Sequence, residues 1–232
     1  MIKIVSFKIC PFVQRVTAAL EAKQIPYEID YISLSDKPEW FLEVSPNGQV
    51  PILITESGTT LFESDAIIEY IEDEFGPLEQ GVTNEQRALD RAWSYLGSKH
   101  YLPQCGTMSS KNGETFAERS EKLIKAFKKA EDKLSGDTQF FKSNELSNVD
   151  MAWLPLLHRA AVVKDKVGYD FLCGLPKMQA WQANLLSTGL AEKSVSEDFV
   201  ELFSGFYLTN TYLAEGKDIQ QQGACASSSC CG

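Results

Sequence analysis

Long apolar runs are missing from this 232-residue chain. No stretch of about eighteen apolar residues occurs, and no charged-then-apolar leader follows Met1, so neither a membrane span nor a signal peptide is predicted. The chain also lacks an Asn-x-Ser/Thr sequon, and its six cysteines are too sparse for a disulfide-stapled fold. These absences predict a cytosolic protein in a reducing compartment.

Motifs for metal and nucleotide chemistry are absent as well. Only two histidines occur, His100 and His158, and neither belongs to an HExxH motif or to a Cys/His cluster with zinc spacing. No GxGxxG occurs, and no GxxxxGK followed by Ser or Thr, so the loops that cradle phosphates are missing. We therefore expect no bound metal and no nucleotide chemistry.

Positive charge is scarce and unevenly placed. The formal net charge is −10, of which residues 1–76 carry −8 and the remainder −2. Nucleic acids and anionic bilayers both reward positive patches. Neither is expected to be the main partner.

The first 76 residues alternate between strand and helix patterns. They predict strands at residues 2–7, 27–34, 51–55 and 59–62, and helices at 11–23 and 64–75. The segments 2–7, 11–23 and 27–34 form a β-α-β pattern, which implies a right-handed crossover between parallel strands. Ser57-Gly58 is a hairpin signal that adds an antiparallel pair. The order indicates one small α/β domain.

Beyond Gly76 the pattern becomes helical throughout. Helices are predicted at residues 84–100, 114–134, 149–163 and 177–186. Ser147, with Asp150 at the third helical position, has the form of a capping box. The polar, small-residue segment 216–232 predicts disorder, and no role is assigned to its three cysteines, Cys225, Cys230 and Cys231.

Cys10 stands between the first strand and the first helix, with Pro11 behind it. As N-cap residue ahead of a proline, its sulfur would lie beside the unpaired amides of the first turn. Those amides and the helix dipole favour an anion and lower the pKa of a cysteine. A free cysteine is more often buried and inert. The placement nevertheless favours a reactive thiolate at neutral pH.

The motifs of the first domain resemble those of cytosolic glutathione transferases. The resemblance is to the cysteine-type classes, especially omega transferases and their lambda and dehydroascorbate-reductase relatives, and is carried by CPF (10–12), KPEWFLEVSPNGQVPIL (37–53) and FESDAI (62–67). Weaker support comes from SNVDMA (147–152) and LPKMQAW (175–181).

The resemblance implies an architecture of α/β followed by all-α. It places a thioredoxin-like glutathione-binding domain of β-α-β-α-β-β-α order at residues 1–77 and an all-helical domain at 84–215. It also implies a homodimer, with the helices at 64–75 and 84–100 as the seam, and glutathione as co-substrate.

Glutathione ligands follow from the resemblance residue by residue. Val50 precedes Pro51, which matches the cis-proline whose isomer turns the Val50 backbone toward the cysteinyl part of glutathione; an ordinary X–Pro bond is usually trans. Glu63 and Ser64 match the site for the γ-glutamyl carboxylate at a helix start, where Ser is otherwise a plain N-cap. Lys37 matches a lysine that reaches the glycine carboxylate, although alone it reads as a solvated charge.

Two aromatic residues are candidates for the neighbouring pockets. Phe12 could line the thiol pocket, and Trp181 matches an aromatic that walls the second-substrate pocket in omega-like proteins. An aromatic at helical spacing is more often part of the core, so that alternative stays open for both.

Departures from related patterns limit the chemistry. No second cysteine follows Cys10 at CxxC distance, so dithiol cycling within this motif is not expected and glutathione must supply the second thiol. The family's alternative Tyr or Ser, which stabilises the glutathione thiolate, is also missing; Ser6 and Tyr27 are nearest, and both fall in strands. Conjugating activity is expected to be weak.

Three hypotheses about function remain. The first is a glutathione-dependent thiol transferase or reductase in which Cys10 forms and resolves mixed disulfides. The second is a non-catalytic binding or regulatory module, which would not need to retain the whole set of site residues. The third, a Cys-His hydrolase using His100 or His158, lacks any local signature.

Overall fold

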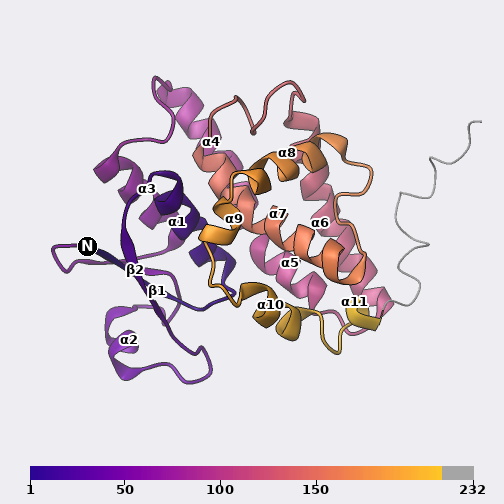
Figure 1. The fold of residues 1–232 in the computed structure, drawn as a ribbon, viewed down its shortest axis with the longest axis horizontal. Coiled ribbons are helices and arrows are strands. Elements are labelled where there is room, and N and C mark those ends of the chain that lie inside the picture. The colour runs from indigo at the N-terminus through magenta and orange to yellow at the C-terminus, as the bar shows by residue number, and fades with distance from the viewer. Residues whose placement is uncertain (216–232) are drawn as a thin grey trace, which may run out of the picture.

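The computed structural model describes residues 1–215, so the predicted disordered tail at 216–232 and its three cysteines lie outside the described residues. No helix in the described part of the chain combines the length and apolar character needed to cross a membrane. The predicted fold class is confirmed: a small sheet with helices is followed by a helical remainder (Figure 1).

The N-terminal part follows the predicted order. Its elements are β1 (Ile2–Ser6), α1 (Pro11–Ala22), β2 (Tyr27–Tyr31), α2 (Glu39–Val44), β3 (Ile52–Ile54), β4 (Thr60–Phe62) and α3 (Ser64–Phe75). The strands lie in the order β2-β1-β3-β4, with β1 parallel to β2 and the other two pairs antiparallel. Both the β-α-β crossover and the hairpin at Ser57-Gly58 are confirmed.

Side chains of β1 alternate between two apolar layers, as strand geometry requires. Ile4 belongs to the main core, together with Leu20 of α1 and Ile67 of α3. Val5 points to the other face, where it packs with Phe41 of α2. The sheet is therefore covered on both faces.

The C-terminal part contains only helices in its described residues. They are α4 (Asn84–Ser98), α5 (Tyr101–Met108), α6 (Gly113–Lys133), α7 (Asn148–Val167), α8 (Pro176–Ser187), α9 (Leu190–Lys193), α10 (Phe199–Tyr207) and α11 (Tyr212–Glu215). The capping box at the start of α7 is confirmed, since the Ser147 amide donates to Asp150 Oδ2 at 2.8 Å.

α7 is the element that joins the two parts. It lies in the middle of the helical part and contacts α1 as well as α4, α5 and α8 (Figure 1). Most of its side chains are buried, because it is apolar on nearly all sides. The apolar core consequently runs without a break from Ile4 under the sheet to Trp153 of α7.

Candidate active site

Cys10 occupies the predicted position at the start of α1. It is the N-cap residue with Pro11 at the first helical position, and its amide donates to the Phe7 carbonyl at 2.9 Å. The Cys10 side chain is half-buried and makes no capping hydrogen bond. The sulfur is thus held at the start of α1 without a capping hydrogen bond.

Strand pairing brings Val50 next to the loop that carries Cys10. β1 and β3 pair antiparallel through Val5 and Ile52, so the loop that follows β1 lies at the same end of this pair as Val50, which precedes β3. The Val50–Pro51 bond is cis, as the resemblance predicted. Within residues 1–215 neither the amide nor the carbonyl of Val50 has a hydrogen-bond partner. A main-chain donor and acceptor are therefore available at this end of the sheet.

Ser64 follows β4, the strand that pairs with the other edge of β3. β3 and β4 pair antiparallel through Ile52 and Phe62, so the residues after Phe62 lie at the same end of the sheet as the residues before Ile52. Ser64 is 5% exposed and is the first residue of α3, while Glu63 is the N-cap residue. No group among the described residues is hydrogen bonded to the Ser64 hydroxyl. The plain capping role left open by the sequence therefore does not apply to Ser64.

Glu63 has an unusual backbone conformation. Its φ is +66°, a region that residues with a side chain rarely occupy and that is often found at functional sites. The exposed Glu63 carboxylate accepts a hydrogen bond from Asn47 Nδ2 at 2.9 Å. This bond ties the start of α3 to the loop before Val50.

Lys37 reaches the same loop from the segment before α2. Its ammonium group donates to the Gly48 carbonyl at 2.8 Å. A positive charge is therefore held near Val50. The Gly48 carbonyl oxygen that it contacts is neutral, so the carboxylate of a ligand could take its place.

Phe12 contacts the helical part of the chain. It is half-buried, and its ring meets that of Tyr101 edge-on, with 5.0 Å between ring centroids. Tyr101 begins α5, so the first turn of α1 faces α5 across the junction of the two parts.

Arg159 is a neighbour of Cys10 that the sequence analysis missed. It is 1% exposed, and its Nη2 donates to the carbonyl of Ile9, the residue before Cys10, at 3.0 Å. Its Nη1 donates to Gln14 and to the Pro155 carbonyl. An arginine in the middle of the apolar segment of α7 was the only signal that the sequence offered, because buried arginines need partners.

Burial sets the direction of the Cys10 titration. Desolvation raises the pKa of the Cys10 thiol, whereas the amides of Val13 and Phe12 and the charge of Arg159 act to lower it; the net pKa is above the ordinary value. The prediction of a lowered pKa is therefore wrong for the free protein. The helix-start argument counted the amides but not the apolar surroundings of the sulfur.

We expect the pKa of Cys10 in the free protein to lie above the value of about 8.5 for a free thiol. Arg159→Gln should raise this pKa further, because the positive charge favours the thiolate, whereas Arg159→Lys should stay closer to the parent. The measurement is ultraviolet absorbance of the thiolate against pH, with Cys105, Cys173 and the tail cysteines replaced. A parent pKa at or below that of a free thiol would contradict the dominance of burial.

The histidines give no support to a Cys-His hydrolase. His158 accepts a hydrogen bond from Gln14 Nε2 at 2.8 Å and stacks on Phe199. Burial, with a contribution from the charge of Arg159, lowers the pKa of His158 to about 3. His100 Nδ1 lies 2.6 Å from the Leu96 carbonyl of the preceding helix. Both imidazoles are engaged in contacts of the fold, with Gln14 and Phe199 for His158 and with the Leu96 carbonyl for His100.

Trp181 lies in the core of the helical part. It is 2% exposed, its Nε1 donates to Asp150 Oδ1 at 2.8 Å, and its ring contacts Phe141 and Trp153. The core alternative therefore holds, because no face of Trp181 is left to wall a substrate pocket. The prediction that it lines such a pocket is corrected.

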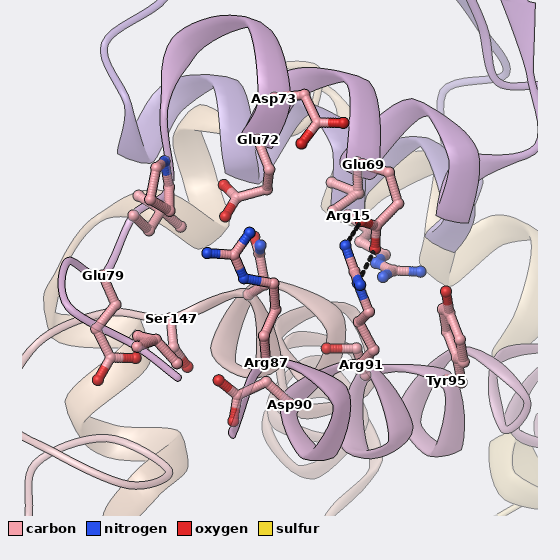
Figure 2. A pocket seen from close by; sticks show the side chains of 16 residues that line it. Arg15, Glu69, Glu72, Asp73, Glu79, Arg87, Asp90, Arg91, Tyr95 and Ser147 are labelled. Atoms are coloured by element: carbon pink, nitrogen blue, oxygen red, sulfur yellow. Dashed lines mark hydrogen bonds and ion pairs between the residues drawn. The ribbon is translucent and has the colours of Figure 1, made fainter. Parts of the chain in front are cut away.

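A charged cavity lies between α3 and α4, and Cys10 is not among its lining residues. Figure 2 shows the Arg91 and Glu69 side chains pointing toward each other across it; Arg91 Nε donates to Glu69 Oε1 at 2.8 Å. Among residues 1–215, no group of three or more His, Cys, Asp or Glu side chains is arranged to hold a metal ion.

Fold and site together define the class of protein. A thioredoxin-like domain bears a cysteine at the start of its first helix and a cis-proline at the end of the paired strand, and a helical domain packs against it through α7. The chain is therefore a thioredoxin-like domain followed by a helical part, with a cysteine thiol at the start of its first helix.

Comparisons with known proteins identify the family. A family model described as "Glutathione S-transferase, N-terminal domain" matches residues 9–74. Glutathione S-transferase omega-1 of Rattus norvegicus is 30% identical over 210 residues, which cover 87% of this chain and 86% of that protein. The probable glutathione S-transferase DHAR1, cytosolic, of Oryza sativa subsp. japonica is 31% identical over 153 residues, or 66% and 68% of the two chains.

The fold agrees with these matches. Glutathione transferase Omega 3C from Trametes versicolor has a TM-score of 0.74 to this chain, with 23% identity and coverage of 88% of this chain and 89% of its own. The chain belongs to the cytosolic glutathione transferase superfamily. At the level of the family it is a glutathione-dependent transferase or reductase, which confirms the resemblance stated from the motifs.

Proposed function

We propose that this chain is an omega-like thiol transferase or reductase in which Cys10 forms and resolves mixed disulfides with glutathione. The observation that carries the proposal is the convergence at one end of the sheet of the Cys10 thiol, the unpaired main chain of Val50 and the unpaired hydroxyl of Ser64. The thiol and the strand-like main-chain edge suit the cysteinyl part of glutathione, and the hydroxyl at the helix start suits its γ-glutamyl carboxylate.

Each part of glutathione has a partner in this arrangement. The cysteinyl residue pairs with the Val50 main chain beside Pro51, which leaves its sulfur directed at Cys10. The γ-glutamyl carboxylate takes the Ser64 hydroxyl and the first amides of α3, while the Glu63 carboxylate suits the γ-glutamyl ammonium group. Lys37 exchanges the Gly48 carbonyl for the glycine carboxylate. Phe12 borders the thiol.

The reaction is thiol–disulfide exchange in two steps. The Cys10 thiolate attacks the glutathione sulfur of a glutathionylated substrate, so that the substrate leaves as a thiol and a Cys10–glutathione disulfide forms. A second glutathione thiolate then attacks the bound glutathione sulfur, which releases oxidised glutathione and regenerates Cys10. Reduction of dehydroascorbate likewise consumes two electrons, which two glutathione molecules supply as they become oxidised glutathione.

A raised Cys10 pKa is compatible with this role. The thiolate fraction at neutral pH is smaller, but a thiolate of higher pKa is intrinsically more nucleophilic. The positive charge of Arg159 counteracts burial at the sulfur. Because only the thiolate attacks, the rate of the first step should rise with pH until the Cys10 pKa is passed.

Conjugating activity is expected to be weak, because the two hydroxyls considered in place of the family's Tyr or Ser are engaged elsewhere. Ser6 is 2% exposed and donates to the Phe7 carbonyl at 3.2 Å. The Tyr27 hydroxyl donates to Glu21, and burial raises the pKa of Tyr27. Neither is available to stabilise the thiolate of glutathione.

A side-by-side assay tests the proposal. With glutathione as the reductant, we expect turnover of a glutathione mixed disulfide and of dehydroascorbate, and a rate with a chlorinated aromatic lower by at least about tenfold, since no hydroxyl activates the glutathione thiol. Faster turnover of the chlorinated aromatic would overturn the assignment. Glutathione binding without turnover of any of the three would favour the non-catalytic module.

We also propose that the chain forms a homodimer through α3 and α4. The exposed Leu89, the half-exposed Tyr95 and the Arg91–Glu69 ion pair lie on these helices, and such a mixed surface is suited to a two-fold interface. A cytosolic location is proposed with it, because exchange with glutathione requires a reducing compartment.

A further inference from the structure

A second thiol approaches the site from the helical part of the chain. α5 carries Tyr101 and Cys105 one helical turn apart, so both side chains lie on one face of the helix. That face packs against the first turn of α1, where the Tyr101 ring meets the ring of Phe12 at 5.0 Å. Phe12 is two residues beyond Cys10, and both cysteines belong to the same apolar cluster.

Arg159 is shared by the two thiols. Its Nη2 donates to the carbonyl of Ile9, directly before Cys10. Its charge acts on both sulfurs: burial raises the pKa of Cys10 and of Cys105, and Arg159 opposes that rise in each. The two thiols also act on each other, since Cys105 contributes to the raised pKa of Cys10. The charge of one guanidinium thus acts on both the half-buried Cys10 thiol and the buried Cys105 thiol.

Tyr207 of α10 also acts on Cys105. Its hydroxyl lowers the pKa of the Cys105 thiol, against the larger rise that burial causes. Cys105 is itself 9% exposed. A large disulfide in solution therefore has little access to Cys105, whereas a disulfide formed on Cys10 lies within its own cluster.

We propose that Cys105 is a resolving thiol, which attacks Cys10 once Cys10 has formed a mixed disulfide with glutathione. This inference rests on the proposed function. The Cys10–glutathione S–S bond breaks, a Cys10–Cys105 bond forms, and glutathione leaves as a thiolate that takes up the proton lost by Cys105. Two further glutathione molecules reduce the internal disulfide and become oxidised glutathione.

The absence of a CxxC motif therefore does not restrict the protein to a single thiol. The second sulfur is supplied by α5, 95 positions further along the chain, and reaches the site because α7 holds the two parts together. An internal disulfide would release glutathione early and protect Cys10 from further oxidation.

Oxidised glutathione tests the inference in a protein that keeps only Cys10 and Cys105, with Cys173 and the tail cysteines changed to Ser. We expect the parent of this series to gain and then lose a glutathionyl group, ending as an internal disulfide that joins the Cys10 and Cys105 peptides. Cys105→Ser should retain the adduct on Cys10. Intact mass after rapid acid quenching, with peptide mapping under non-reducing conditions, measures both species.

Two further variants test whether the conversion depends on the Cys105 thiol itself or only on the structure of α5. Tyr207→Phe should leave adduct formation unchanged and slow its conversion by about fivefold, since the Tyr207 hydroxyl that favours the Cys105 thiolate is lost. Thr107→Val, which removes a buried hydroxyl bonded to the Pro103 carbonyl on the same helix, should leave both steps unchanged. This control shows that disturbing α5 alone is not sufficient.

The outcomes separate the inference from the function beneath it. A stable adduct on Cys10 with Cys105 still open to alkylation overturns the resolving role and leaves the thiol transferase intact. Failure of Cys10 to form an adduct in any variant contradicts the proposed function itself, and the resolving role with it.

Discussion

Cys10→Ser is expected to abolish thiol transfer while glutathione still binds. The hydroxyl of serine cannot form a disulfide, so turnover of a glutathione mixed disulfide should fall by on the order of a thousandfold or more. Affinity for glutathione should change by less than about threefold, because the proposed contacts to Val50, Ser64 and Lys37 do not involve the Cys10 sulfur. Calorimetric titration of the variant and a coupled turnover assay measure the two quantities.

Folding provides the control for this variant. Cys10 makes no capping hydrogen bond to α1, whereas Ser is among the preferred residues at an N-cap. The melting temperature of Cys10→Ser should therefore equal or exceed that of the parent. Loss of activity together with loss of glutathione binding would show that the sulfur also holds the ligand, and that the roles have been divided wrongly.

Local patterns predicted the elements whose signals lie close together in the sequence. The hairpin was found because Gly58, whose φ is +85°, marks the turn between two short β-prone runs. The start of α7 was found because Ser147 and Asp150 are three positions apart. Such signals are decided within a few residues of chain, and tertiary packing did not override them.

α2 could not be predicted from its own pattern. The helix has only six residues, and Phe41 is its one buried side chain, while Trp40 and Leu42 stay exposed. A single buried position gives no helical periodicity to read. The motif resemblance predicted this helix where the hydrophobic pattern did not.

The surroundings of Cys10 were the part that sequence reasoning could not supply. Arg159 and Cys105 lie on α7 and α5, far from Cys10 along the chain, and no spacing rule connects them. Their position depends on how the helical part packs against α1. The direction of the Cys10 pKa depended on the same packing, and for that reason the local helix-start argument gave the opposite sign.

Ser64→Ala is expected to lower glutathione affinity by roughly ten- to a hundredfold. The substitution deletes one hydrogen bond to a charged carboxylate, which contributes on the order of 1.5–3 kcal/mol. Stability should change little, because Ser64 is the first residue of α3 rather than its N-cap, and its hydroxyl has no partner among residues 1–215. Calorimetric titration with glutathione and thermal unfolding are measured on the same sample.

Asn112→Ala is the matched control for Ser64→Ala. Asn112 is the N-cap residue of α6, and its side chain accepts a hydrogen bond from the Thr115 amide at 2.9 Å. Removing that cap should cost about 1 kcal/mol of stability and leave glutathione affinity unchanged. Ser64→Ala should therefore lower glutathione affinity with little change in stability, whereas Asn112→Ala should lower stability with no change in affinity.

Glu63→Gln tests whether the neighbouring acid contributes by its charge. The amide keeps an oxygen that can accept the hydrogen bond from Asn47, so the loop before Val50 should stay in place. Loss of the negative charge should then weaken glutathione binding by removing the partner of the γ-glutamyl ammonium group. If Ser64→Ala binds glutathione as tightly as the parent while its melting temperature falls by as much as that of Asn112→Ala, Ser64 supports the helix alone, and the γ-glutamyl group must be held elsewhere.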